Sequence, residues 1–333
     1  MALSVDKRPA SYEELVKALD ELYRKAKRKA RIKLWISAVL ALLGIAMMIY
    51  PVVATFQKNQ ALAEQINKYQ NVIESLPPER NDAAMMLAWD YNRELSVHPI
   101  VQPPIGAESS DPDFSAYAKQ LVDKPGDPMA QIAMPSVDIN LPVFHGASSE
   151  VLKKGAGHLY GTSLPVGASE DGQTRTSAIS AHTGMVNASM FDNLHKLKKG
   201  DSAFIRVRGR TLHYVMVDSK IVDPEDRDAV YTVEGKDLLQ LITCTPYSVN
   251  TQRLVVTLER APLPSPMPDL ETAKNPYGPA GWQWWMTVTL VVALVFLLLF
   301  LFTWWSNRRY LRNLRERIAQ RNWEATRDTP IGA

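Results

Sequence analysis

Two long runs without a charged residue constrain this chain most strongly. They extend from Leu34 to Phe56 and from Trp282 to Ser306. About 20 consecutive apolar residues suffice for a helix to cross a bilayer, and tryptophans stand at both ends of the second run, as they do at membrane interfaces. The first run could instead be a secretory signal peptide, but a long hydrophilic leader precedes it and no clear cleavage site follows. We therefore expect two transmembrane helices.

Basic residues flank both runs on the side that faces a terminus. Arg24 to Arg31 precedes the first run, and Arg308 to Arg312 follows the second. The positive-inside rule places such segments in the cytoplasm. This predicts a two-pass protein of the cell membrane, with both termini cytoplasmic and the middle of the chain extracellular. The net charge of +3 is mostly this asymmetry, so the basic residues do not indicate a nucleic-acid partner.

The residues between the two runs change in character along the chain. Apolar side chains recur at helical spacing from Leu62 to Ile73 and Pro77-Pro78 follows them, which predicts one helix, with a second over 82–95. Beyond these helices, Pro, Gly, Ser and Asp predict an irregular segment. The expected organisation is a cytoplasmic leader (1–33), a transmembrane helix (34–56), a helical segment (57–98), an irregular loop (99–128), a domain rich in short apolar stretches (129–260), a proline-rich spacer (261–281), a transmembrane helix (282–306) and a cytoplasmic tail (307–333).

The predicted domain over 129–260 is a succession of short apolar stretches separated by turn residues. Such spacing predicts a mainly β fold, a closed or nearly closed β-barrel with short helices. The helices are expected at 149–153, at 190–194 and near Lys236. The expected strands are 132–134, 139–143, 156–159, 176–181, 203–207, 212–217, 238–242 and 254–258.

Cys244 is the only cysteine of the chain, and it ends one expected strand shortly before Arg253 begins the next. If these strands are neighbours, the thiol and the guanidinium share one end of the barrel. A thiol is only a small fraction thiolate at neutral pH, and a neighbouring cation favours the charged form. The pair therefore suits a nucleophile and an oxyanion-stabilising cation. A lone cysteine also fits an exported domain, since no second thiol can trap it in an internal disulfide.

The best acid or base partner among the six histidines is His182, which follows an apolar stretch and precedes Thr183-Gly184. The end of a strand holds a side chain and exposes it at the same time. His145 and His158 lie in sequence contexts that indicate structural roles. Cys244, His182 and Arg253 could each be structural as well, as a small buried residue, a satisfied histidine and an exposed strand-end charge.

These segments resemble the catalytic motifs of sortases, and most closely those of class C, the pilus-assembling transpeptidases of Gram-positive bacteria. The resemblance covers roughly residues 129 to 260. It departs from the family at Gln240, Ser248 and Gln252, where Thr, Gly and often His are usual. The matching motifs are Ala181-His182-Thr183-Gly184, Ile242-Thr243-Cys244-Thr245-Pro246-Tyr247, Val249-Asn250-Thr251-Gln252-Arg253, Leu141-Pro142-Val143-Phe144-His145-Gly146 and the segment from Gly155 to Gly167.

The resemblance implies a cysteine transpeptidase that cleaves an LPxTG-like sorting signal between Thr and Gly. Cys244 would form a thioester, His182 would move the protons, and Arg253 would hold the oxyanion. A lysine amine of a pilin subunit would then accept the acyl group. A housekeeping sortase that anchors surface proteins to the peptidoglycan of the cell wall is the alternative within the family. A hydrolytic cysteine protease and a non-catalytic binding module are alternatives outside it.

Class C sortases carry a lid over the active site, anchored by an Asp-Pro-aromatic motif. The nearest match here is Asp111-Pro112-Asp113-Phe114, with one extra residue before the aromatic. In this reading Asp111 or Asp113 faces Arg253, and Phe114 covers Cys244. The alternative is an ordinary helix N-terminus before Phe114. No Cys/His cluster or acidic loop indicates a metal site, and the resemblance implies no cofactor.

Overall fold

The computed structural model describes residues 12–97, 111–167, 174–185, 187–268, 270 and 284–327. The chain divides into two compact units. The helical unit combines residues 1–50 with 284–333, and the barrel unit consists of residues 51–283. The helix α1 (Tyr12–Ser75) contributes its first part to the helical unit and its last part to the barrel unit.

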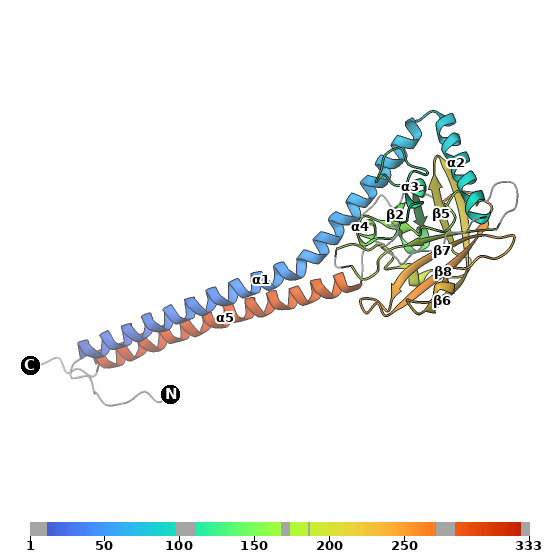
Figure 1. The fold of residues 1–333 in the computed structure, drawn as a ribbon. Coiled ribbons are helices and arrows are strands. Elements are labelled where there is room, and N and C mark those ends of the chain that lie inside the picture. The colour runs from blue at the N-terminus through green and yellow to red at the C-terminus, as the bar shows by residue number, and fades with distance from the viewer. Residues whose placement is uncertain are drawn as a thin grey trace, which may run out of the picture. The chain divides into compact units, whose positions relative to one another are not determined.

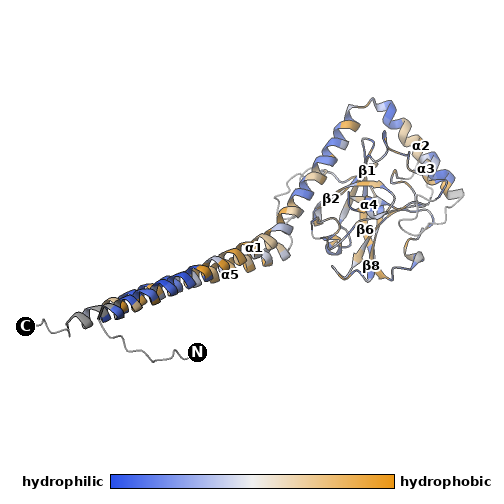
Figure 2. Ribbon diagram, turned by 60° about the vertical axis from the view of Figure 1, so that its left-hand side comes forward, coloured by the Kyte–Doolittle hydropathy of each residue, from blue (hydrophilic) through white to orange (hydrophobic). Residues whose placement is uncertain are grey.

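The helical unit pairs the N-terminal part of α1 with α5 (Trp284–Arg327), and the two run side by side (Figure 1). Both helices are long and apolar enough to cross a membrane. Asn307 donates a hydrogen bond to the backbone oxygen of Ala30 at 3.3 Å. The hydrophobic middle of α1 passes into hydrophilic turns toward the N-terminus (Figure 2). Both helices therefore continue beyond the predicted apolar runs into their basic flanks.

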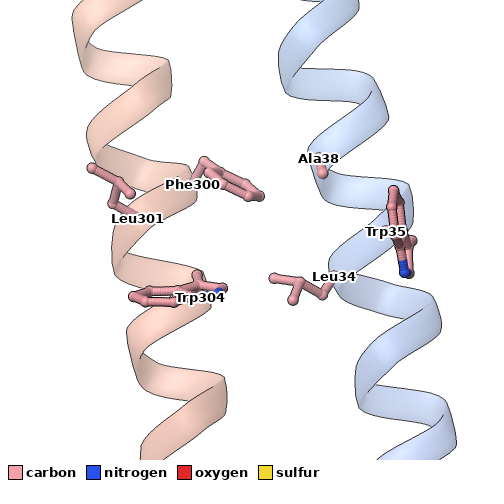
Figure 3. A pocket seen from close by; sticks show the side chains of 6 residues that line it. All are labelled: Leu34, Trp35, Ala38, Phe300, Leu301 and Trp304. Carbon is pink, nitrogen blue, oxygen red and sulfur yellow. The ribbon is translucent and has the colours of Figure 1, made fainter.

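An apolar groove of about 270 Å³ lies between these two helices (Figure 3). Phe300 of α5 points toward α1, and Leu34 of α1 points toward α5. Trp35, in contrast, is 72% exposed. Exposed side chains of this kind, repeated along both helices, would be covered by lipid in a bilayer. The groove is lined by Leu34, Trp35, Ala38, Phe300, Leu301 and Trp304.

The last part of α1 and α2 (Pro78–Val97) pack against the barrel within the barrel unit. The apolar face predicted for α1 is buried, with Leu62, Ile66, Tyr69 and Ile73 between 3% and 7% exposed. Tyr69 also donates its hydroxyl to the backbone oxygen of Met129 at 3.0 Å. The second helix begins at Pro78 rather than at the predicted residue 82, because proline is well tolerated in the first turn of a helix.

Eight strands form a closed barrel in the order β1-β2-β3-β4-β7-β8-β6-β5. This confirms the prediction of a mainly β, barrel-forming domain. The helix α3 (Phe114–Tyr117) precedes the first strand. Between the strands, the described residues form α4 (Ser149–Leu152) and the 3₁₀ turns η2 (Pro135–Val137), η3 (Leu194–Lys196) and η4 (Arg227–Ala229). The strands are β1 (Ala130–Met134), β2 (Ile139–His145), β3 (Ala156–His158), β4 (Arg175–Ser180), β5 (Ser202–Val207), β6 (Arg210–Val222), β7 (Asp237–Thr245) and β8 (Gln252–Ala261).

Two helix predictions and one strand prediction were inaccurate. The helix expected at 190–194 is a set of turns that lead into η3, and the helix expected near Lys236 is replaced by η4. The strand β6 continues to Val222, beyond the predicted end at residue 217. The polar residues Asp218, Ser219 and Lys220 interrupt the apolar pattern there, so the pattern did not reveal the extension. The extension pairs with β8 from Asp218↔Thr257 to Val222↔Arg253.

The strand β7 is apolar on both faces. Leu239 and Leu241 belong to the main core inside the barrel, whereas Ile242 belongs to a second apolar cluster with Ala178 and Val255. A strand covered on both faces reads as a continuous apolar run. This double burial fixes β7 firmly just before it delivers Thr243 and Cys244 to the end of the barrel.

Candidate active site

The three predicted catalytic residues come from three strands that are neighbours in the barrel. In the parallel pair β4 and β7, Ser180 is level with Ile242. In the antiparallel pair β7 and β8, Cys244 is the direct partner of Arg253. His182 stands two residues after Ser180, as Cys244 stands two residues after Ile242. The topology therefore brings the three segments to one end of the barrel.

The strand end that carries Cys244 is held by hydrogen bonds to the segment before His182. Thr243 donates its hydroxyl to the backbone oxygen of Ala181 at 2.7 Å, and the amide of Ala181 donates to the oxygen of Ile242 at 3.2 Å. Cys244 itself is a free thiol that is half-buried. A nucleophile needs this combination of a fixed backbone and an accessible sulfur.

His182 lies in a half-buried position. Desolvation lowers the pKa of its imidazole, and the positive charge of Lys153 lowers it further. Lys153 caps the C-terminal end of α4 and forms a salt bridge with Glu150 at 3.1 Å. A lowered pKa favours the neutral imidazole near pH 7. In that form His182 can accept a proton from a thiol, and the imidazolium so formed can return one.

Arg253 directs one guanidinium nitrogen, Nη1, at the backbone oxygens of Asn250 and Gln252, at 3.2 and 3.1 Å. Across residues 111–167 and the other described ranges, no carboxylate forms a salt bridge with Arg253. A guanidinium has five N–H donors. The contacts of Nη1 thus orient the group and leave donors for an incoming carbonyl oxygen.

The loops after His182 and after Cys244 pack backbone against backbone. A Cβ atom built on Gly184 would lie 2.9 Å from the nitrogen of Ser248, which is closer than real Cβ contacts allow. Both residues have positive φ angles, +74° for Gly184 and 63° for Ser248. Since glycine favours this region, the conformation accounts for the glycine that similar enzymes have in place of Ser248.

Asp192 is a residue of this site that the sequence analysis did not identify. It is 4% exposed and accepts hydrogen bonds from Thr183 and Gly184 on one side and from Tyr247 on the other. The only feature of the sequence that could have indicated a role for Asp192 is its position in a turn-rich segment, ten residues after His182. A buried carboxylate at a loop rarely stands without partners.

The two other histidines of the motif segments have structural contacts. The ring of His158 lies between the hydroxyl of Tyr117, 2.8 Å from Nδ1, and the backbone oxygen of Ser163, 2.8 Å from Nε2. Burial lowers the pKa of His158 to about 4 and that of His145 to about 3. Both rings are therefore neutral at physiological pH, in agreement with the structural roles expected for them.

The segment of the predicted lid is described only from Asp111 onward. Asp111 accepts a hydrogen bond from the amide of Asp113 at 2.8 Å, and Asp113 precedes α3 without a side-chain cap bond. The ring of Phe114 packs on Tyr160 and Tyr117, with centroids 5.3 and 5.4 Å apart. These contacts match the start of a helix. Residues 99–110 of the predicted lid lie outside the described residues, and the role of the segment stays a prediction.

The residues that the structure describes contain no group of three or more His, Cys, Asp or Glu side chains that could hold a metal ion.

Comparisons with known proteins agree with this arrangement. Residues 132–261 match the model of the sortase domain. The crystal structure of sortase C-1 from Actinomyces oris is 42% identical, with a TM-score of 0.51, and the match covers 55% of this chain and 99% of that chain. Sortase C from Streptococcus pneumoniae is 32% identical, with a TM-score of 0.53, over 61% of this chain and 100% of the other.

A curated relative extends the match to a further type of sortase. Sortase A from Streptococcus agalactiae is 26% identical over 229 residues, which are 68% of this chain and 83% of the relative. Sortases are cysteine transpeptidases. The chain belongs to the sortase family.

Proposed function

We propose that this sortase assembles pili, with Cys244 as nucleophile, His182 as acid and base, and Arg253 as the oxyanion ligand. The observation that carries the assignment is the pairing of Cys244 with Arg253 across β7 and β8. His182 follows two residues after Ser180, which pairs with Ile242 of β7. Similarity to sortase C-1 of Actinomyces oris and to the pneumococcal sortase C, which is described with pilin substrate specificity, supports the pilus class.

The first half-reaction forms a thioester. Neutral His182 removes the proton of the Cys244 thiol, and the sulfur attacks the threonine carbonyl of an LPxTG-like sorting signal. Arg253 donates hydrogen bonds to the oxyanion of the tetrahedral intermediate. The bond between Thr and Gly breaks, and the imidazolium returns its proton to the leaving glycine amine. The acyl group then remains on the sulfur.

The second half-reaction transfers the acyl group to an amine. The ε-amine of a pilin lysine attacks the thioester and gives a proton to neutral His182. The C–S bond breaks, and the imidazolium returns this proton to the leaving Cys244 thiolate. The product is an isopeptide bond between two pilin subunits. Repetition of this cycle lengthens the polymer.

We also propose that the two apolar helices anchor the enzyme in the cell membrane, with both termini cytoplasmic and the barrel extracellular. The basic segments outside each helix support this orientation. A sortase in this position would meet exported pilins at the membrane surface.

A housekeeping sortase, which attaches surface proteins to the cell wall, is a second candidate. The similarity to Sortase A from Streptococcus agalactiae, over 83% of that protein, favours it. The two candidates share the thioester and differ in the amine that resolves it.

A competition between amines tests the proposal. The purified full chain is incubated with a peptide that contains an LPxTG-like motif, a lysine-containing pilin peptide and a peptidoglycan fragment, and the products are identified by mass spectrometry. A pilus-assembling enzyme joins threonine to the lysine ε-amine. Products on the peptidoglycan amine alone support the housekeeping function, and a free threonine carboxylate as the main product with both amines present contradicts both.

The lid is a separate proposal for the segment 99–128. Occlusion would lower the apparent affinity for the sorting signal by the fraction of enzyme that is closed. Replacement of Asp111, Asp113 and Phe114 by alanine should then accelerate alkylation of Cys244. A rate equal to that of the wild type would leave these residues as the start of α3 only.

A further inference from the structure

The carboxylate of Asp192 contacts both loops that leave the catalytic end of the barrel. Its Oδ1 atom accepts hydrogen bonds from the amide of Gly184 at 2.7 Å and from the hydroxyl of Thr183 at 3.1 Å. Its Oδ2 atom accepts the hydroxyl of Tyr247 at 3.5 Å. Thr183 and Gly184 directly follow His182, and Tyr247 stands three residues after Cys244.

Asp192 is in turn held by the backbone on its own side. The amide of Phe191 donates to the oxygen of His182 at 3.0 Å, and the ring of His195 lies 2.8 Å from the backbone oxygen of Asp192. The turn 191–195 therefore binds the loop that contains His182 twice, through the amide of Phe191 and through the carboxylate of Asp192. The direct contact between Gly184 and Ser248 brings the second loop within reach of the same carboxylate.

We propose that Asp192 is a positioning residue whose carboxylate ties the loop that carries His182 to the loop that follows Cys244, and so sets the distance between imidazole and thiol. The inference rests on the proposed roles of His182 and Cys244. Asp192 touches neither the substrate nor the reacting atoms. It acts through the two loops, where a displacement of about 1 Å is enough to slow a reaction by a hundredfold.

The burial of this carboxylate is unfavourable to the folded state. Burial raises the pKa of Asp192 to about 6, against the lowering effect of the hydrogen bonds from Gly184, Thr183 and Tyr247 and of the charge of Lys196. If Asp192 only supported the fold, a neutral side chain at this position would give a more stable protein, because it would avoid the cost of burying a charge. The ionised form, however, offers acceptor oxygens to both loops at once, which is what a link between two donor-bearing loops requires.

An asparagine at position 192 distinguishes a role in positioning the two loops from a role in stabilising the fold, because asparagine has the shape of the protonated aspartic acid. In Asp192→Asn the side-chain oxygen can still accept the hydrogen bonds from Gly184 and Thr183. The amide nitrogen, however, cannot accept a hydrogen bond from the hydroxyl of Tyr247. The variant should lower kcat about three- to tenfold at pH 8 with little change in KM. At pH 5, where the wild-type carboxyl is itself protonated, the ratio of wild-type to variant kcat should approach one.

Stability should change in the opposite direction. Since the pKa of Asp192 is raised to about 6 in the folded state, the wild type loses stability as the pH rises from about 4 to about 6. Asp192→Asn, which cannot ionise, should therefore melt at a temperature equal to or above that of the wild type at pH 5, with the larger difference at pH 8. A loss of activity without a loss of stability distinguishes positioning from support of the fold.

Asp237→Asn is the matched control. Asp237 begins β7 at the end of the barrel opposite to Cys244 and likewise accepts a tyrosine hydroxyl, that of Tyr214, at 3.1 Å. This variant should change stability and leave the pH dependence of kcat as in the wild type. Tyr247→Phe removes the hydroxyl that donates to Oδ2, and its effect combined with Asp192→Asn should be less than additive, because both delete this link.

The experiment uses the purified full chain in detergent, hydrolysis of a peptide with an LPxTG-like motif, and alkylation of Cys244, all from pH 5 to 8. The expected result is a wild-type to Asp192→Asn ratio of kcat that rises with pH through about 6. Asp192→Ala, which loses all three contacts, should lower kcat at every pH and shift the alkylation profile toward that of His182→Ala.

Two outcomes overturn the inference in distinguishable ways. A folded Asp192→Asn with the kcat of the wild type at pH 8 would remove Asp192 from the site and leave the proposed function intact. Unchanged peptide cleavage in Cys244→Ala and His182→Ala would remove the proposed catalytic residues, and the positioning role would fall with them.

Discussion

Cys244 and Arg253 are nine residues apart in the sequence and direct partners in the register of β7 and β8. The loop between them turns the chain by means of residues with positive φ, among them Ser248 and Asn250. The backbone of the same loop receives the guanidinium nitrogen Nη1 of Arg253. The turn that joins the two strands thus also orients the cation beside the thiol.

Arg253→Ala should lower kcat/KM by about a hundredfold or more, the usual effect of removing an oxyanion donor. Arg253→Lys keeps the charge but loses the planar fork of donors. Its kcat/KM should therefore lie between those of Arg253→Ala and the wild type. Kinetics of peptide cleavage measure both. Arg260→Ala, at the far end of β8, is the control and should stay within about threefold of the wild type. Equal activity of Arg253→Ala and Arg260→Ala would contradict the oxyanion role.

Much of the barrel was predictable because its signal is local. Apolar runs marked β7 and β8, the stretch around Ala178 and Ile179 marked β4, and the order of the motifs placed Cys244 and Arg253 at facing strand ends. The helical face from Leu62 to Ile73 followed from spacing alone and is buried as expected. In each case one stretch of sequence carried enough information, because burial on a strand or on a helix face imposes its own period.

The contacts that hold the site were not predictable in the same way. Asp192 acquires its role from Gly184 and Tyr247, which reach it only through the packing of loops. The sequence analysis did not single out Tyr117, yet its hydroxyl contacts His158 and the amide of Gly146 inside the barrel unit. Such tertiary hydrogen bonds leave no periodic trace in a single sequence.

Lys153→Ala should raise the pKa of His182, because it removes a positive charge that disfavours the imidazolium. The acid limb of the kcat/KM profile should then move to higher pH, since the neutral base is lost earlier as the pH falls. The shift should be small, because Lys153 is exposed and also pairs with Glu150.

Lys154→Ala provides the control for this profile, as a neighbouring lysine that does not act on the pKa of His182. Its acid limb should coincide with that of the wild type. An unchanged profile in Lys153→Ala, or a shift to lower pH, would show that the charge of Lys153 does not reach the imidazole in the working enzyme.

The barrel unit should lose stability as the pH falls from about 6.5 toward 4. The pKa values of His158 and His145 are lowered to about 4 and about 3 in the folded state. Between these values and pH 6.5, both histidines are therefore protonated in the unfolded chain and neutral in the folded chain. Protonation below pH 6.5 therefore favours unfolding. Thermal unfolding at a series of pH values measures the effect, and His158→Gln should reduce the slope over this range.

Tyr117→Phe should destabilise the same region by about 1 to 3 kcal/mol, the cost of leaving buried partners unsatisfied. The hydroxyl contacts Nδ1 of His158 at 2.8 Å, donates to the oxygen of the same residue at 2.9 Å and accepts the amide of Gly146 at 3.1 Å. Denaturant unfolding gives the free energy. Tyr247→Phe, at a tyrosine that is 37% exposed, should cost much less, and similar losses in the two variants would contradict the anchoring role of Tyr117.

Gly184→Ala should lower kcat/KM by about tenfold or more, through a forced separation of the two catalytic loops. The added Cβ would meet the backbone nitrogen of Ser248 at 2.9 Å, and a backbone atom cannot move aside as a flexible side chain can. The positive φ of +74° adds strain of about 1 kcal/mol. Gly200→Ala isolates this second effect, because Gly200 has a φ of +93° and nothing within 4 Å of the added atom. Gly200→Ala should therefore lower the melting temperature and leave kcat/KM unchanged, whereas Gly184→Ala should lower both. If the two variants lose equal stability and neither loses activity, the contact between Gly184 and Ser248 has no part in holding His182 beside Cys244.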